Sequence, residues 1–267
     1  MNKTESGNVA KYYDNLWNFK PDIPDNIIEI VEKKVNKNRS FFFDKLVLDA
    51  GCGQGRFSYA LAGISKKLIS IDRGSENIRY AKKILGNFNN VIFIQCDILK
   101  LPFKYNSFDF VFSNGVIHHI NDPHKSFNNL TKIVCSKGYL YVGVYGKGLN
   151  QGLIDKCLRF TFSRIPIKWA IIFYSLFYTK ETMLWSEKIN MATVPSIQYR
   201  FSLEEISGMF QNAGFINVHK NNLAKTKNQE LIEKYISNFG YKILKFIYGT
   251  VKGGRDSVWH EIIGEKK

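Results

Sequence analysis

Five short apolar runs follow one another in the first part of the chain, separated by segments with a helical repeat. The runs are rich in branched and aromatic residues and predict buried strands at Lys45–Ala50, Lys67–Asp72, Val91–Gln95, Phe108–Ser113 and Tyr139–Tyr145. The segments between them predict helices at Gly55–Ile64, Ser75–Leu85 (with Ser75 as N-cap) and Asp122–Val134. Because right-handed crossovers leave few other topologies, this alternation predicts an α/β fold with a doubly wound, mostly parallel sheet.

The flanking segments extend the pattern. An amphipathic helix is expected over Pro24–Val35, and the Ser202–Glu205 pair is typical of the capping box of a helix over Ser202–Ala213, which Gly214 ends. Two further strands, with a helix between them, bring the expected sheet to seven strands: Phe215–His219, Glu230–Ile247 and Val258–Gly264.

The stretch Val47–Gly55, VLDAGCGQG, joins the first predicted strand to the first helix of the alternating series. Its three glycines, Gly51, Gly53 and Gly55, supply a turn where backbone can adopt positive φ and approach a ligand closely. The following helix directs its N-terminal amides at this turn, which favours an anionic group. A strand, a glycine turn and a helix open nucleotide-binding sheets. For this motif taken alone, a tight turn without a ligand is the alternative.

Acidic residues stand at or next to the ends of three successive predicted strands: Asp49, Asp72 and Asp97. Asp72 follows the glycine turn by about 20 residues, the spacing at which dinucleotide-binding sheets place a ribose-binding carboxylate. Since the carboxyl ends of parallel strands share one edge of a sheet, the three acids and the turn should meet there. The sequence therefore predicts a ligand site at this edge.

The motif D-x-G-C-G-x-G at Asp49–Gly55 resembles that of class I S-adenosylmethionine-dependent methyltransferases of the small-molecule type. It differs from the G-x-G-x-x-G of nicotinamide dehydrogenases. The resemblance continues through CDILKLPFKYNSFDFVFSNGVIHHINDP (Cys96–Pro123) and KGYLYVGVYG (Lys137–Gly146), and more loosely through Tyr199–Val218. It implies a Rossmann-like methyltransferase fold with an antiparallel seventh strand, and S-adenosylmethionine as the cofactor.

The resemblance also implies ligand contacts. The Gly51–Gly55 turn would hold the methionyl end of the cofactor, and Asp49 would fix that turn or accept from the ammonium group. Asp72 would take both ribose hydroxyls, because a carboxylate offers two acceptor oxygens. Asp97 would accept from the adenine amino group while Ile98 covers the ring; for the three acids, a turn or cap is the alternative. The full implied set is Tyr13, Asp49, Gly51, Cys52, Gly53, Gly55, Asp72, Arg73, Asp97, Ile98, Ser113 and Asn114.

Three positions in this set need comment. Ser113 and Asn114 end the fourth strand, where backbone carbonyls would meet the cofactor ammonium. Tyr13 belongs to an aromatic N-terminal segment that lies over the cofactor mouth in similar enzymes; packing on the core is the alternative. Arg73 departs from the common pattern, in which the residue after the ribose-binding acid is often apolar, so the second contact beside Asp72 stays open.

Methyl transfer is an in-line displacement that depends on placing the acceptor about 3 Å from the methyl carbon. A base helps where a hydroxyl must lose its proton. His118 and His119 follow the fourth strand at the ligand edge, and histidine titrates near neutral pH. We take His119 and His118 as candidate bases. The alternative is that one packs and the other touches the pocket wall.

The chain carries 38 Lys and Arg against 23 Asp and Glu, a net charge of +15. This bias favours anionic partners, but the lysines are scattered and no nucleic-acid motif is evident, so nucleic acid is not expected. The four cysteines form no C-x-x-C pair, which argues against zinc and against a disulfide framework. Because the N-terminus also lacks an apolar signal sequence, we expect a cytoplasmic location.

Residues 147–199 interrupt the alternation and carry a basic, aromatic stretch, Lys156–Tyr178. We expect a helical insertion after the fifth strand that acts as a lid over the acceptor. It would separate an N-terminal cover and cofactor-binding half, 1–146, from a C-terminal part of the same domain, 200–267. An interfacial helix on a membrane and a helical insertion packed on the sheet edge are the alternatives.

The sequence therefore predicts an enzyme that transfers a methyl group from S-adenosylmethionine to an O, N or C nucleophile of a small or medium-sized acceptor, with sugar- or phosphate-bearing molecules among the options. A lipid-linked or RNA acceptor is the alternative. A dehydrogenase or a non-catalytic nucleotide-binding protein on the same sheet stays open, because a fold does not decide function. The oligomeric state stays open as well.

Overall fold

The computed structural model describes residues 23–147, 199–220 and 259–267. All of them except Lys147 belong to one compact unit, formed by Met1–Gly146, Ile197–Asn222 and Trp259–Lys267. Tyr13, the helix expected over Glu230–Ile247 and nearly all of the expected insertion lie outside the described residues. Within the described ranges, no helix is long and apolar enough to cross a membrane.

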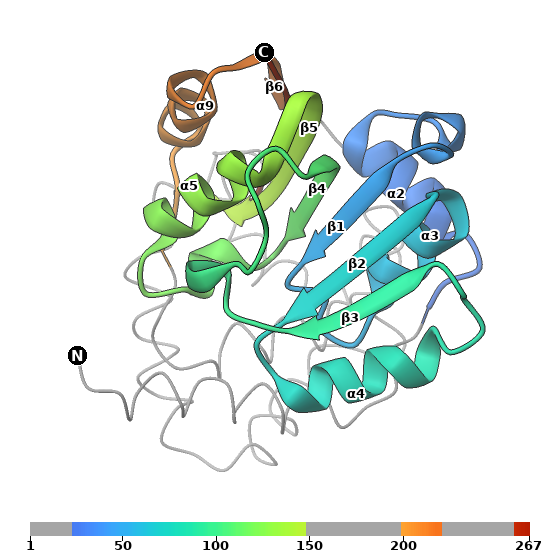
Figure 1. Cartoon of the computed structure of the whole chain (residues 1–267). Coiled ribbons are helices and arrows are strands. Elements are labelled where there is room, and N and C mark those ends of the chain that lie inside the picture. Colours follow the sequence, from blue (N-terminus) through green and yellow to red (C-terminus); the bar gives the residue numbers. More distant parts are fainter. Residues whose placement is uncertain (1–22, 148–198, 221–258) are drawn as a thin grey trace, which may run out of the picture. The chain divides into compact units, whose positions relative to one another are not determined.

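Seven strands form one sheet in the order β3-β2-β1-β4-β5-β7-β6 (Figure 1). Strands β1 to β5 pair in parallel, whereas β7 is antiparallel to both β5 and β6. The doubly wound, mostly parallel sheet with an antiparallel seventh strand is thus confirmed. The strands are β1 Leu46–Ala50, β2 Lys67–Asp72, β3 Val91–Gln95, β4 Phe108–Asn114, β5 Val134–Tyr145, β6 Phe215–Lys220 and β7 Trp259–Lys266.

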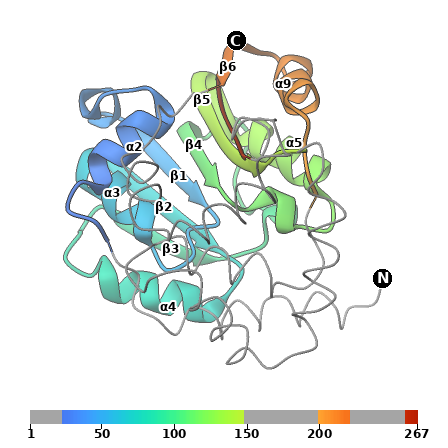
Figure 2. The same cartoon turned by 180° about the vertical axis from the view of Figure 1, so that it is seen from behind.

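Helices cover both faces of this sheet (Figures 1 and 2). Helices α2, α3 and α4 contribute to the apolar cluster on one face, and α5 and α9 to the cluster on the other. The bounds are α2 Ile27–Val35, α3 Arg56–Ile64, α4 Ser75–Ile84, α5 Pro123–Ile133 and α9 Leu203–Asn212, with short 3₁₀ helices η1 Arg39–Phe42, η2 Ile98–Lys100 and η3 Ile117–His119.

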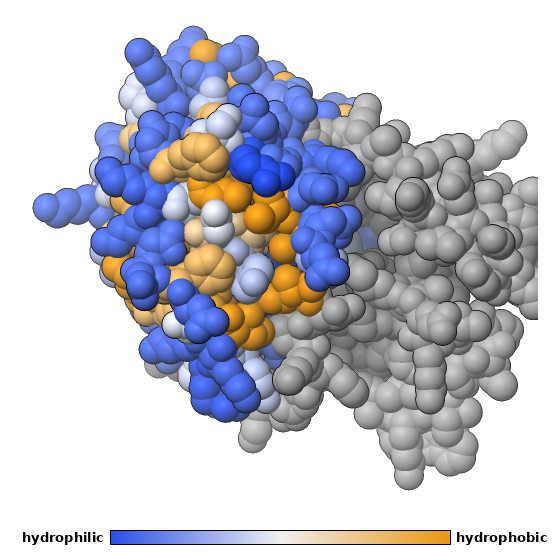
Figure 3. Space-filling model, turned by 90° about the vertical axis from the view of Figure 1, so that its right-hand side faces the viewer, coloured by the Kyte–Doolittle hydropathy of each residue, from blue (hydrophilic) through white to orange (hydrophobic). Residues whose placement is uncertain are grey.

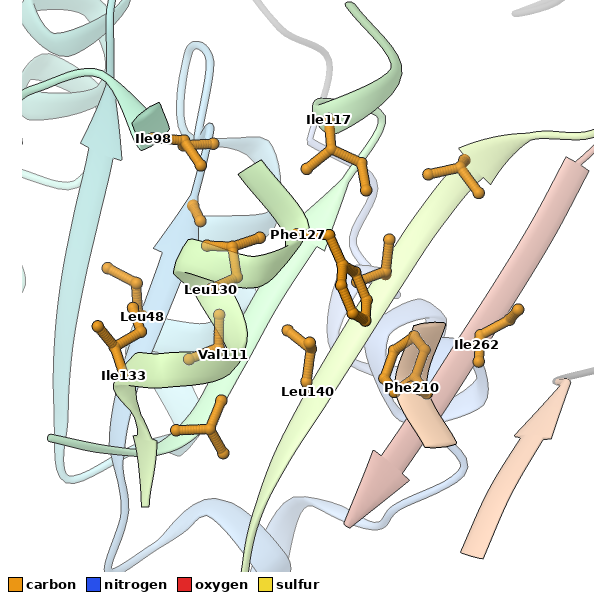
Figure 4. Packing of buried hydrophobic residues seen from close by; sticks show 14 of the residues in the cluster. Leu48, Ile98, Val111, Ile117, Phe127, Leu130, Ile133, Leu140, Phe210 and Ile262 are labelled. Carbon is orange, nitrogen blue, oxygen red and sulfur yellow. The ribbon is translucent and has the colours of Figure 1, made fainter. Parts of the chain in front are cut away.

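The apolar core is split by the sheet. Beneath α5, Phe127 and Leu130 point toward Val111 and Leu140 of the strands (Figure 4). Alternate residues of β1 enter different clusters: Leu48 joins the one under α5, and its neighbour Val47 joins the one under α2 and α3. A strand that is covered on both faces has a nearly continuous apolar sequence, and this explains the apolar run of β1.

Local signals set the helix ends. Asp122 accepts a hydrogen bond from the Lys125 amide at the start of α5. The Ser202–Glu205 capping box is present on α9, which confirms that prediction. The expected Ser75 cap is wrong, because Gly74 is the N-cap of α4. Asp72 accepts from the Gly74 amide instead, since the acid at the strand end reaches the start of the helix.

The described part of the chain exposes few large apolar side chains. On the side that lies to the right in Figure 1, apolar residues gather at the centre and hydrophilic residues surround them (Figure 3). Single exposed apolar residues are normal on folded proteins, so they do not mark a binding face by themselves. The large apolar side chains exposed over the described ranges are Phe43, Tyr59, Ile92, Tyr105, Leu203 and Ile216.

Candidate active site

The glycine turn lies at the carboxyl edge of the sheet, between β1 and α3, and its three glycines have positive φ. A Cβ on Gly51 would come within 2.4 Å of Val116 Cγ2, and one on Gly55 within 2.7 Å of Leu85 Cδ1. These two positions therefore need glycine for packing as well as for φ. A Cβ on Gly53 would meet nothing within 4 Å. Gly53 thus presents an open backbone face that a ligand can approach.

The amides of this turn donate within the protein. The Gly51 and Cys52 amides both donate to Ile71 O, at 2.8 and 2.9 Å. The Gly53 amide donates to Asp72 Oδ2 at 2.8 Å, and the Gly55 amide donates to Cys52 O at 3.0 Å. These four amides are engaged within the protein, so the expectation that the turn holds a methionyl group stays a prediction. They hold the turn against β2, which leaves the open face of Gly53 for a ligand.

Asp72 organises both the turn and the next helix. Its Oδ2 accepts from the Gly53 amide, and its Oδ1 accepts from the Gly74 amide at 2.8 Å and from Asn77 Nδ2 at 3.1 Å. A carboxylate has about four lone-pair positions, so three are used and one on Oδ2 remains. Asp72 can accept one ribose hydroxyl as it stands, and the expected pair of hydroxyls stays a prediction.

Asp49 is buried beneath the turn, with 2% of its surface exposed. Its Oδ2 accepts from Ser58 Oγ of α3 at 2.6 Å, and Ser70 Oγ of β2 lies 3.1 Å from the same hydroxyl. Burial, with a smaller contribution from the nearby charge of Asp72, raises the pKa of this carboxyl to about 7 against the lowering effect of the Ser58 hydrogen bond. Of the two expected roles, the geometry supports fixing the turn rather than meeting an ammonium group.

Asp97 and Arg73 come together across the ends of β3 and β2. Asp97 Oδ1 accepts from the Leu99 amide at 2.9 Å, and its Oδ2 lies 3.9 Å from Arg73 Nε. Both side chains are partly exposed, which leaves them within reach of a ligand. Ile98 is different, because η2 directs it into the core, where 5% of it is exposed (Figure 4). It therefore offers little surface for an adenine ring, contrary to expectation.

Three other predicted residues serve the framework. Burial, followed by the charges of nearby acids, raises the pKa of the Cys52 thiol well above its ordinary value, so this cysteine is neutral. Ser113 is fully buried and donates to Ala50 O at 3.2 Å, which ties β4 to β1. Asn114 is half-buried at the edge, and its Oδ1 accepts from Tyr141 OH at 3.0 Å.

The two histidines differ. His118 is fully buried, and its ring centroid lies 4.1 Å from that of His119 and 4.3 Å from that of Tyr145. Burial lowers the pKa of His118 well below its ordinary value, and the charges of His119 and Arg200 lower it further. This environment makes His118 a poor base and favours a packing role. His119 is only half-buried and stays a candidate base.

Sequence reasoning missed Trp259, Tyr145 and Arg200 at this edge. Trp259, the first residue of β7, pairs with Tyr145, the last residue of β5, and their ring centroids are 5.2 Å apart. The Arg200 guanidinium lies 5.9 Å from the Tyr145 ring centroid. No local motif marks these residues, because antiparallel pairing and the return of the chain at 199–201 bring them together.

Comparison with known proteins supports the resemblance. Residues 44–160 match the profile of a methyltransferase domain family. A demethylmenaquinone methyltransferase from Staphylococcus aureus is 24% identical over 218 residues, which cover 79% of this chain and 83% of the relative.

Two solved structures share the fold. The YcgJ protein from Bacillus subtilis superposes with a TM-score of 0.58 at 16% identity, covering 91% of this chain and 99% of that one. A phosphoethanolamine N-methyltransferase from Haemonchus contortus, solved in complex with S-adenosyl-L-methionine, gives 0.58 at 18% identity over 96% of this chain and 56% of its own. With the D-x-G-C-G-x-G turn and the sheet order, these matches identify residues 44–160 as a methyltransferase domain and support the predicted S-adenosylmethionine-dependent methyltransferase.

Proposed function

We propose that this protein transfers a methyl group from S-adenosylmethionine to an O, N or C nucleophile of a small or medium-sized acceptor. The observation that carries the proposal is the open face of Gly53 beside the Asp72 carboxylate. Both lie at the carboxyl edge, where open α/β sheets bind ligands.

Different residues along this edge would contact different parts of the cofactor and the acceptor. S-adenosylmethionine, when bound, supplies an electrophilic methyl group on a sulfonium centre. Asp72 accepts a ribose hydroxyl, Asp97 accepts from the adenine amino group, and the open face of Gly53 receives the methionyl end. Asn114 and His119 stand on the β4 side, where the acceptor would approach. Orientation of the two reactants supplies much of the rate enhancement in such a displacement.

The relatives' names support more than one acceptor chemistry. One is named for demethylmenaquinone and another for phosphoethanolamine. Their identities to this chain are 24% and 18%, so neither acceptor transfers by similarity alone. We infer that the part of the site that binds S-adenosylmethionine, here called the donor half, resembles that of these relatives. The part that binds the methyl acceptor differs from theirs.

Isothermal titration calorimetry tests the donor half. The pure protein should bind S-adenosylmethionine and S-adenosylhomocysteine and should not bind NAD. Asp72→Asn should weaken binding at least about tenfold, because it removes a charge-assisted hydrogen bond worth about 1.5–3 kcal/mol and loosens the turn. Asp44→Asn is the matched control, since that acid is exposed and far from the edge in the described structure.

Two results would contradict the proposal. NAD binding without any response to the methyl donor would indicate a dehydrogenase. Unchanged affinity in a folded Asp72→Asn variant would show that the acid serves the turn alone. Transfer of radiolabelled methyl groups to a panel of quinol, phosphoethanolamine and RNA acceptors then separates the acceptor classes.

A further inference from the structure

Asp72, the acid that the proposed function assigns to the cofactor ribose, accepts three hydrogen bonds, and a side chain supplies one of them. The main-chain amides of Gly53 and Gly74 donate to Oδ2 and Oδ1, each at 2.8 Å. Asn77 Nδ2 donates to Oδ1 at 3.1 Å. Main-chain amides are present whatever the side chain is, so Asn77 is the donor whose side-chain chemistry the sequence specifies.

Asn77 is the third residue of α4, and it lies on the side of this helix that packs against the glycine turn. Ala81 follows it by four residues and therefore shares that side of the helix. A Cβ on Gly55 would come within 3.1 Å of Ala81 Cβ, so the helix and the turn are in close contact. This packing fixes the position of Asn77 relative to the turn that Asp72 also contacts.

The environment of Asn77 is unfavourable for stability. The residue is 7% exposed, and its Oδ1 is buried without a hydrogen-bond partner in the described part of the structure. A buried acceptor that receives no hydrogen bond is costly, whereas an apolar side chain of the same shape avoids that cost. Such an exception calls for a reason other than stability. The hydrogen bond from Nδ2 to Asp72 supplies one.

This hydrogen bond restricts the rotation of the Asp72 carboxylate. The χ2 torsion of aspartate has broad preferences, so its hydrogen bonds decide which oxygen faces which donor. Oδ1 accepts from two donors and Oδ2 from one, which leaves one acceptor position on Oδ2. The remaining position is therefore on the oxygen that contacts Gly53, the residue with the open backbone face.

An amide is well suited to orient this carboxylate. A lysine or arginine would also donate to Oδ1, but it would form an ion pair that competes with the ligand for the charge. The Asn77 amide is neutral, so the negative charge of Asp72 stays available. Hydrogen bonds to an ionised acceptor are roughly twice as strong as bonds between neutral groups.

We propose that Asn77 is a positioning residue for cofactor binding: its amide holds Asp72 in the orientation that offers Oδ2 to a ribose hydroxyl. The inference rests on the proposed function, in which Asp72 accepts that hydroxyl. Asn77 acts through Asp72 and not by contact with the cofactor. This role extends the donor half of the site to a residue of α4 that the sequence motifs do not mark.

Calorimetry with two ligands tests whether Asn77 acts through the ribose contact. The ligands are S-adenosylhomocysteine and its analogue that lacks both ribose hydroxyls. Asn77→Leu replaces the amide by an apolar side chain of similar volume. We expect the variant to bind S-adenosylhomocysteine about tenfold more weakly and to bind the analogue within about twofold of the wild type. Equal losses for both ligands, or no loss for either, would overturn the proposal.

Urea unfolding separates this loss of affinity from a loss of stability. Asn77→Leu removes a buried oxygen without a partner, so it should be at least as stable as the wild type. Asn90→Leu is the matched control, because Asn90 Nδ2 donates to Ala62 O and Ser65 O, both at 2.9 Å, just before β3 and away from the carboxyl edge. This control should lose stability and keep its affinity for S-adenosylhomocysteine. An equal loss of affinity in both variants would reject the positioning role.

A double variant distinguishes this inference from the proposed function. In the Asp72→Asn background, Asn77→Leu should change the affinity by less than about twofold, because no carboxylate remains to be oriented. Unchanged affinity in Asp72→Asn alone would reject the proposed function and this inference with it. Weaker binding by Asp72→Asn but not by Asn77→Leu would reject only the positioning role. Asn77→Ala, which adds no bulk, replaces Asn77→Leu in these measurements if the latter does not fold.

Discussion

Asp49 is a buried acid that titrates near neutral pH. Burial, with a smaller contribution from the charge of Asp72, raises its pKa from 3.8 to about 7. Between about pH 4 and pH 7 the folded protein holds a proton that the unfolded chain has released. The free energy of unfolding therefore falls as pH rises through this window, by roughly 4 kcal/mol for a shift of this size.

Asp49→Asn removes this ionisation and keeps an oxygen that accepts from Ser58. Relative to the wild-type protein, the variant should become progressively more stable as pH rises from about 4 to about 8. Urea unfolding of both proteins across that range measures the difference. Asp44→Asn, which alters an exposed acid, should run parallel to the wild type. A constant difference between Asp49→Asn and the wild type at every pH would show that Asp49 does not titrate there.

Two of the three positive-φ glycines in the turn between β1 and α3 have opposite surroundings. Gly51 packs against Val116, whereas Gly53 faces open space. A methyl group at Gly51 has no room, so Gly51→Ala should be strongly destabilising. At Gly53 the added methyl costs only backbone strain, about 1–2 kcal/mol in this region of φ.

Gly53→Ala should therefore fold and yet bind S-adenosylhomocysteine at least about tenfold more weakly, because its methyl group occupies the open face that the ligand would approach. Thermal unfolding and calorimetry measure the two effects. Gly214→Ala is the matched control, since Gly214 also has positive φ and open space but ends α9. Wild-type affinity in Gly53→Ala would mean that the ligand does not cover this face.

At the level of the whole chain, the net charge of +15 favours anionic partners. The basic stretch Lys156–Tyr178 lies outside the described residues, so its expected role as a lid stays a prediction. A lid implies that the protein does not float with vesicles rich in acidic lipid at about 0.15 M salt, where the Debye length is about 8 Å. Liposome flotation measures this.

The membrane alternative predicts a different result in the flotation assay. Flotation that rises with acidic lipid, falls with salt and is lost on deletion of 156–178 would reject the lid as the main role. S-adenosylhomocysteine binding by the deletion variant is the control for an intact donor site. Such a result would support a lipid-linked acceptor.

The local pattern of the chain was sufficient for the seven strands and the helices α2, α3, α4, α5 and α9, and for the edge that carries Asp49, Asp72 and Asp97. Strand periodicity, helix caps and glycine turns act over a few residues, so they can be read without knowing which strands pair. The local pattern does not predict which side chains contact one another in the folded protein. Tertiary packing directs the turn amides and Asp72 toward each other, buries Ile98 and His118, and brings Trp259 to the active edge because β7 runs antiparallel to β5. Contacts between residues far apart in the chain have no local periodicity, and therefore only the folded structure reveals them.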